Sequence, residues 1–184
     1  NHFRVSVLRR ARAWDPYNVT EDADLGMRLA RMGYRTAVIQ SSTYEEAPSR
    51  FGPWLRQRTR WFKGWLQTWA VHMRSPRSLA ADLGVRGFAV FQLMVGGTVL
   101  AALVHSLFAV QFIGSLAAAM LSDAPDIRSS ELHAVALLSG YLISATLGLI
   151  GLARRGLLRC AWALLLMPLY WMLLSLAEIG RAHV

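Results

Sequence analysis

Residues 87–122 read GFAVFQLMVGGTVLAALVHSLFAVQFIGSLAAAMLS and contain no Asp, Glu, Lys or Arg. A helix needs about 20 apolar residues to cross the hydrocarbon of a bilayer. The stretch therefore predicts a first membrane span with an extension, over residues 85–112. Two more uncharged runs follow, at residues 132–153 and 160–177, and Pro168 is expected to kink the third. Three such runs in the second half of the chain argue against the alternative, a buried soluble core.

The two halves of the chain differ in charge. Residues 1–87 hold 15 of the 20 Lys and Arg and 7 of the 11 Asp and Glu, a net charge of +8, whereas residues 88–184 have a net charge of +1. With 54% apolar residues in the whole chain, intrinsic disorder is excluded. Cys160 is the only cysteine, so a disulfide scaffold is excluded as well.

Arginine placement predicts the orientation of the spans. Arg154, Arg155 and Arg159 lie between the second and third spans, whereas the loop at 123–131 carries three acids and one arginine. Because basic loops stay on the cytoplasmic side, we expect the basic half of the chain there too. This predicts an integral membrane protein, assigned to a bacterial inner membrane.

The basic half begins with helix and strand signals. Thr20 has the character of a helix N-cap, and acidic residues fill the turn after it, where they meet unpaired N–H groups. The predicted helix ends at Gly33. Residues 36–40 are a candidate strand. This alternation predicts that residues 1–50 form part of an α/β unit.

An aromatic and basic helix is predicted from Pro53 to about Met73, within a segment assigned to residues 51–80. Its Trp, Phe and Leu residues recur at helical spacing, and cations occupy the rest of its surface. This pattern is typical of an amphipathic helix that lies in the membrane interface.

Two motifs stand about 35 residues apart, Thr20-Glu21-Asp22 and Gln57-Arg58-Thr59-Arg60-Trp61. Together they resemble the C-terminal part of a membrane-embedded family 2 glycosyltransferase of the cellulose-synthase-like kind. That family pairs Thr-Glu-Asp with Gln-x-x-Arg-Trp on an interface helix and continues into transmembrane helices. The resemblance implies an α/β fold for residues 1–50, as the C-terminal portion of a GT-A-type catalytic domain, and a transmembrane region over residues 81–178.

The resemblance implies that Asp22, with Glu21 beside it, supplies the catalytic carboxylate. An ordinary carboxylate is ionised at neutral pH and can accept the proton of an acceptor hydroxyl as the sugar is transferred with inversion. On residue types alone, Asp22 is better explained as a helix-capping acid, a role that Glu21 or Asp24 could serve equally well.

The resemblance also makes Gln57, Arg58, Arg60 and Trp61 the substrate-binding residues. Gln57, Arg60 and Trp61 share one helix face by their spacing. Arg60 could neutralise a departing diphosphate, and Gln57 could bind the nucleotide or the acceptor. Trp61 could stack on a sugar or anchor the helix in the interface.

The family's donor-binding half, with its divalent Mg or Mn site, is expected before Asn1, so this chain is expected to be a fragment without its own metal site and inactive alone. The implied partners are a nucleotide-sugar donor, a polysaccharide or glycolipid acceptor, and membrane lipids. The string at 179–184 matches the translation of a common sequencing adapter, and no function is assigned to it.

The composition and charge are also compatible with two other functions. A non-catalytic membrane scaffold with a basic, lipid-binding interface helix is the main alternative. Nucleic-acid binding, suggested by the charge of +9, is set aside because the basic residues adjoin membrane spans.

Overall fold

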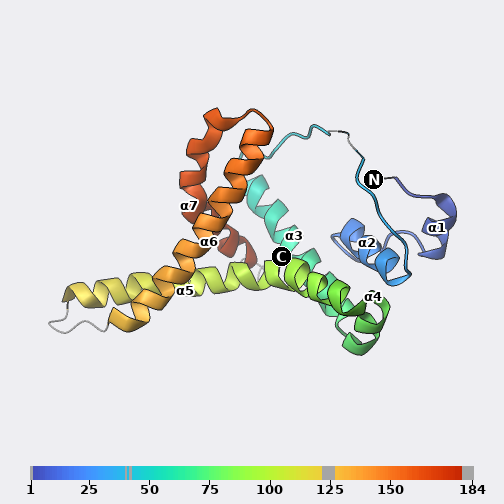
Figure 1. Cartoon of the computed structure of the whole chain (residues 1–184), viewed down its shortest axis with the longest axis horizontal. Helices are drawn as coiled ribbons and strands as arrows, with labels where there is room; N and C mark the ends of the chain where they lie inside the picture. The colour runs from blue at the N-terminus through green and yellow to red at the C-terminus, as the bar shows by residue number, and fades with distance from the viewer. Residues whose placement is uncertain (1, 40, 42, 122–126, 180–184) are drawn as a thin grey trace. The chain divides into compact units, whose positions relative to one another are not determined.

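The computed structural model describes residues 2–39, 41, 43–121 and 127–179. The chain divides into two compact units, one that includes Asn1–Leu100 and one of Ala101–Ile179. Regular structure in the described residues is helical throughout (Figure 1). In the first unit it consists of α1 (Val5–Arg10), α2 (Glu21–Arg31), α3 (Phe51–His72), α4 (Pro76–Phe91), the π-helix η1 (Gln92–Gly96) and the start of α5 (Gly97–Leu121).

The α2 helix packs on two sides. Leu25 and Leu29 are buried against α1 and the residues around it, with Ala11 between them. Met27 packs against a second cluster, in which Leu79, Phe91 and Val95 are buried and to which α3 adds Trp65 and Trp69. Burying both faces stabilises α2, although the helix is only 11 residues long and would be marginal alone.

The predicted α/β fold of residues 1–50 is wrong for the residues described. The candidate strand at 36–40 is not formed at residues 36–39, and Gln40 lies outside the described residues. Residues 35–39 are exposed, with Val38 at 99%. A strand needs a neighbour to pair its N–H and C=O groups. The described residues contain no strand that could pair with this segment, so residues 36–39 form no regular structure and stay exposed to solvent.

The predicted interface helix is confirmed as a helix, because α3 spans Phe51–His72. Its buried residues include Phe62, Gly64, Thr68 and His72. The small residues among these let α2 approach the α3 backbone, as described below. Its position in a membrane interface stays a prediction.

Three described helical stretches are long and apolar enough to cross a membrane, Pro76–Leu121, Glu131–Arg154 and Leu158–Glu178. They contain the three predicted spans and are compatible with an integral membrane protein. The first is interrupted at Gly84, whose φ of 68° is left-handed and suits glycine, and again by the π-helix η1. The break at Gly84 lies directly before Val85, the predicted start of the span.

The second unit contains the rest of α5, α6 (Ile127–Arg154), the 3₁₀-helix η2 (Leu158–Leu166) and α7 (Met167–Ile179). The third span is thus part 3₁₀ and part α. Pro168 is the second residue of α7, where its missing N–H removes no helical hydrogen bond. Residues 122–126 of the predicted acidic loop and residues 180–184 of the expected tail lie outside the described residues.

Candidate active-site turn on the aromatic helix

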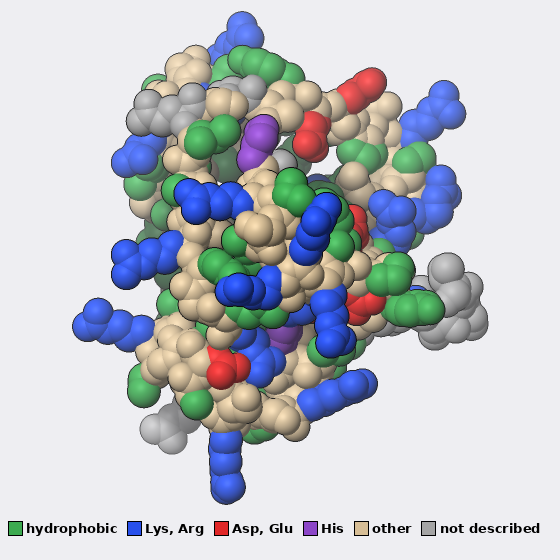
Figure 2. Space-filling model, turned by 90° about the vertical axis from the view of Figure 1, so that its right-hand side faces the viewer, with side chains coloured by type: hydrophobic (Ala, Val, Ile, Leu, Met, Phe, Trp, Pro, Cys, Tyr) green, Lys and Arg blue, Asp and Glu red, His purple; other side chains and the backbone are tan. Residues whose placement is uncertain are grey.

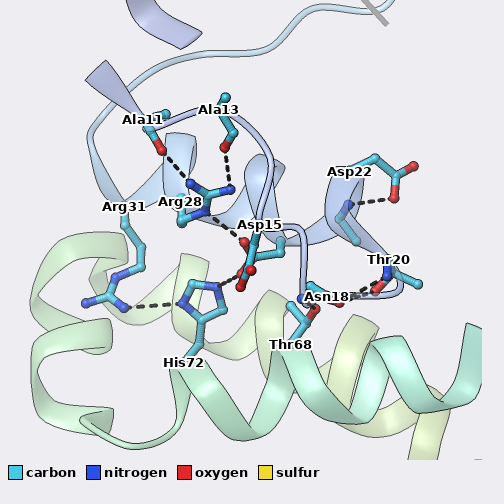
Figure 3. A network of polar contacts seen from close by, with 12 residues as sticks. Ala11, Ala13, Asp15, Asn18, Thr20, Asp22, Arg28, Arg31, Thr68 and His72 are labelled. Carbon is cyan, nitrogen blue, oxygen red and sulfur yellow. Dashed lines mark hydrogen bonds and ion pairs between the residues drawn. The ribbon is translucent and has the colours of Figure 1, made fainter. Parts of the chain in front are cut away.

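The turn before α2 is bound to α3 by Asn18. This buried side chain accepts hydrogen bonds from the backbone N–H of Thr20 at 3.0 Å and from the Thr20 hydroxyl at 3.3 Å. Its Nδ2 donates to Oγ1 of Thr68 on α3, at 2.9 Å. Thr20 occupies the N-cap position but makes no side-chain capping bond, because its hydroxyl is directed to Asn18. Figure 3 shows Asn18 between the turn and α3.

Gly64 lets the turn lie directly on the α3 backbone. A Cβ atom at residue 64 would lie 2.8 Å from Cβ of Thr20, and closer still to its two outer side-chain atoms. The turn has a further bond nearby, in which Nε2 of Gln67 donates to the carbonyl of Tyr17 at 3.0 Å. Gly64 and Thr68 are four residues apart, so both lie on the α3 face that receives the turn.

Asp22 and Glu21, the predicted catalytic carboxylates, lie at the start of α2 and are exposed. One oxygen of Asp22 accepts the backbone N–H of Ala23 at 2.8 Å. Figure 3 shows the Asp22 side chain pointing away from α3. The carboxylate is therefore accessible, and its position follows from the backbone of the turn.

Asp24, considered only as a capping acid in the sequence, is instead buried at 4% exposure. Its Oδ2 accepts Nε–H of Arg28 at 2.8 Å, and its Oδ1 lies 3.2 Å from Nε2 of His72. Burial raises the pKa of Asp24, but the hydrogen bonds from His72 and Arg28 and the positive charge of Arg28 outweigh it, so the pKa lies below its ordinary value. Arg28 also donates to the carbonyls of Ala11 and Ala13, which joins the end of α1 to the network.

The tautomer of His72 follows from its two neighbours. Arg31 cannot accept a hydrogen bond, so its contact of 3.2 Å with Nδ1 of His72 requires Nδ1 to be the acceptor. In a neutral ring the proton is then on Nε2, which faces Asp24. His72 thereby links α3 both to Asp24 in the first turn of α2 and to Arg31 in its last turn.

Arg31 extends this link to α4. It forms an ion pair with Asp82 at 2.8 Å and donates to Ser78 at 3.3 Å. The last turn of α2 is thus held to the part of α4 that precedes the break at Gly84. Both ends of α2 therefore have specific partners outside the helix.

The predicted binding residues lie on α3, one and two turns before Gly64. Trp61 and Gln57 precede Gly64 by three and seven residues, which keeps them on the same helix face. Trp61 is 41% exposed. The guanidinium of Arg58 lies over the Trp61 ring, 4.4 Å from its centroid, in a cation–π contact. Arg60 is exposed.

The two motifs are brought together by the contact of the turn before α2 with Gly64 and Thr68 of α3. Among the residues described, their predicted functional side chains do not contact one another through hydrogen bonds or ion pairs. No hydrogen bond or ion pair joins Asp22 to Gln57, Arg60 or Trp61 in the described part of the chain. Sequence reasoning missed Asn18, Thr68 and His72. The available signal was a series of small or polar residues at positions 64, 68 and 72, four apart, in a helix otherwise rich in Trp.

The cations of α3 are largely on its surface, since Arg56, Arg60 and Lys63 are all exposed. Figure 2 shows many Lys and Arg side chains, and fewer acidic ones, on the face that it views. Within the ranges that the structure describes, no three His, Cys, Asp or Glu side chains gather where they could hold a metal ion. The described residues therefore do not fit the divalent metal that the resemblance implies.

Comparison with known proteins places the chain in a family. The family model described as glycosyl transferase family group 2 matches residues 2–175. A protein of Bacillus subtilis (strain 168), named probable glycosyltransferase YdaM, is 34% identical over 62 residues. That match covers 33% of this chain and only 15% of the relative. No solved structure matches the chain. Because the family model matches nearly all of its residues, the chain belongs to glycosyl transferase family group 2.

Proposed function

We propose that this chain is the acceptor-side part of a membrane glycosyltransferase of the cellulose-synthase-like kind, which transfers a sugar from a nucleotide-sugar donor with inversion. The acceptor is a polysaccharide or a glycolipid, and the reaction takes place at the cytoplasmic face of the membrane. Asp22 is the catalytic base. Gln57, Arg58, Arg60 and Trp61 bind the substrates.

The observation that carries this proposal is the contact between the turn before Asp22 and α3. Thr20 lies against Gly64, and Asn18 is bonded to Thr68. Trp61 is one turn before Gly64, about 4.5 Å along the helix axis at 1.5 Å per residue. Two motifs that are distant in sequence are thus parts of one surface.

The accessible carboxylate of Asp22 supports its role as base. A hydroxyl oxygen of the acceptor attacks the anomeric carbon of the donor and loses its proton to Asp22. The bond between that carbon and the diphosphate oxygen breaks, and the nucleoside diphosphate leaves with the electron pair. Because attack comes from the side opposite the leaving group, the anomeric configuration inverts.

The cationic side of α3 supports a role in binding the donor. Arg60 is exposed and can offer charge-assisted hydrogen bonds to the departing diphosphate. Arg58 is held over Trp61, which leaves less freedom for its guanidinium than a solvated side chain has. Family 2 enzymes generally use a divalent metal, and no step proposed for these residues involves it.

The orientation rests on the loop between the second and third candidate spans. Arg154 ends α6, and Arg155 follows it in the turn before η2. By the tendency of basic loops to remain inside, this loop and the basic residues that precede the first span lie on the cytoplasmic side.

The test is transfer by the full-length protein in native membranes, measured with a panel of radiolabelled nucleotide sugars. Asp22→Asn removes the base while keeping the size of the side chain, so transfer should fall by at least about 100-fold. Glu21→Gln should reduce it less, and Glu46→Gln, in the exposed segment before α3, is the matched control. Normal turnover by the Asp22→Asn protein would exclude Asp22 as the base.

The scaffold alternative makes a different prediction for the same proteins. It draws on the exposed cations of α3, among them Arg56, Arg60 and Lys63. If no donor is used by the wild type, and removal of these three charges releases α3 from the surface of vesicles rich in anionic lipid, the scaffold is the better function.

A further inference from the structure

Asn18 has a single possible orientation in the structure. Its Oδ1 faces the backbone N–H of Thr20, which can only donate, so the amide NH₂ group must face Thr68. Asn18 and Thr68 are 6% and 0% exposed. Removing either of these partners would leave a buried polar group without a hydrogen bond, which lowers the stability of the folded protein. The bond therefore holds the turn at one position along α3.

Gly64 makes that position sterically specific. The side chain of Thr20 fits where α3 has no Cβ atom. The neighbouring positions along this face, Trp61 and Thr68, both carry side chains that would prevent the same approach. A shift of the turn by one helical turn, about 5.4 Å, would bring Thr20 against one of them.

The place of Asp22 depends on this fit. Its carboxylate is exposed, and its hydrogen bond is to the adjacent N–H of Ala23. The backbone of the turn consequently decides where the carboxylate lies relative to Gln57 and Trp61. In catalysis, a misplacement of about 1 Å can cost roughly 100-fold in rate.

We propose that Asn18, Gly64 and Thr68 are positioning residues, which set the register of the Thr20-Glu21-Asp22 turn along α3 and thereby the place of the base. They do not touch the substrate. This inference rests on the proposed role of Asp22.

The kinetic test uses Thr68→Val, which keeps the shape of the side chain and removes its hydroxyl, and Thr68→Ser, which keeps the hydroxyl. In full-length protein, Thr68→Val should lower kcat by about tenfold to 100-fold, with the KM for the donor changed less than about twofold. Thr68→Ser should restore kcat to within about threefold of the wild type. Thr98→Val is the matched control, because the Thr98 hydroxyl bonds locally, to the carbonyl of Met94 four residues earlier.

The geometric test needs no substrate. Spin labels at the exposed residues Ala30 and Lys63, in a Cys160→Ser background, report the distance between α2 and α3 by pulsed electron resonance. Thr68→Val should shift or broaden this distance, and Thr68→Ser should not. If Thr68→Val does not fold, Gly64→Ala, which displaces Thr20 by steric contact, replaces it in both tests.

The results separate the two ideas. An unchanged kcat in Thr68→Val, or an equal loss in the Ser and Val variants, overturns the positioning role even if Asp22→Asn is inactive. If Asp22→Asn retains transfer, the proposed base is wrong, and the distance measurement alone decides whether Thr68 sets the register.

Discussion

Nε2 of His72 lies 3.2 Å from Oδ1 of Asp24, and both side chains are almost fully buried between α2 and α3. The two residues are far apart in sequence, and neither belongs to the motifs that suggested the family. Their contact holds α2 to α3 through a carboxylate that also binds Arg28. The packing of α2 on α3, which positions the Thr20-Glu21-Asp22 turn, thus depends on the buried carboxylate of Asp24.

Asp24→Asn should destabilise the first unit by about 1.5–3 kcal/mol at pH 7, the usual value for hydrogen bonds to a charged group. The folded protein lowers the pKa of Asp24 below its ordinary 3.8. Its contribution to stability is therefore complete above that value and is lost as the pH falls through the lower, folded pKa. Thermal unfolding in detergent, measured across this pH range, should show the wild type and Asp24→Asn converging at low pH.

The control for this measurement is Glu45→Gln, since Glu45 is exposed in the segment before α3. A constant difference between the wild type and Asp24→Asn from pH 7 to the acid limit would contradict the lowered pKa.

Gly64→Ala should destabilise the protein by about 1–3 kcal/mol, the usual cost of overpacking, despite the better helix propensity of alanine. The reason is the overlap of the new methyl group with Thr20, which its bonds to Asn18 hold in place. Gly26→Ala is the matched control, because a Cβ there meets no atom within 4 Å. That variant should gain up to about 1 kcal/mol. Equal effects of the two substitutions on the melting temperature would argue against close contact at Gly64.

His105 and Tyr141 form a hydrogen bond of 2.6 Å between α5 and α6. A double-mutant cycle with His105→Ala and Tyr141→Phe should give a coupling free energy of about 0.6 kcal/mol, and at most about 1.7 kcal/mol, as for other bonds inside membranes. The measurement is unfolding of the detergent-solubilised protein. Additive single effects would show that the bond does not stabilise the helix pair.

A cysteine at residue 155, introduced by Arg155→Cys with Cys160→Ser, should react with a membrane-impermeant maleimide only when the cytoplasmic side is accessible. This follows from the basic loop between α6 and η2. Inside-out vesicles and intact cells provide the comparison. Labelling in intact cells would reverse the proposed orientation.

The helices could be predicted to a large extent from the sequence. The uncharged runs are long enough to specify spans, and the spacing of Trp and Phe predicts α3 within two residues at its N-terminus and one at its C-terminus. The 3₁₀ start of the third span was not predicted, because its apolar composition is the same for either type of helix.

The α/β prediction failed for an equally physical reason. The sequence at residues 36–39 has the β-branched residues of a strand, yet a strand forms only with a partner, and propensity cannot supply one. Helices satisfy their backbone groups internally, so they are the elements for which local pattern is the more reliable guide.

The sequence by itself determined the two motifs, the amphipathic face of α3 and the three stretches able to cross a membrane. Each depends on composition or on spacing within one segment. Only the tertiary structure decided that Thr20 lies on Gly64, that Asn18 bonds Thr68, and that Asp24 is a buried partner of His72 rather than a cap. Periodicity shows which side of a helix is buried, but the partner on that side depends on close packing between residues that are about 50 apart in the chain.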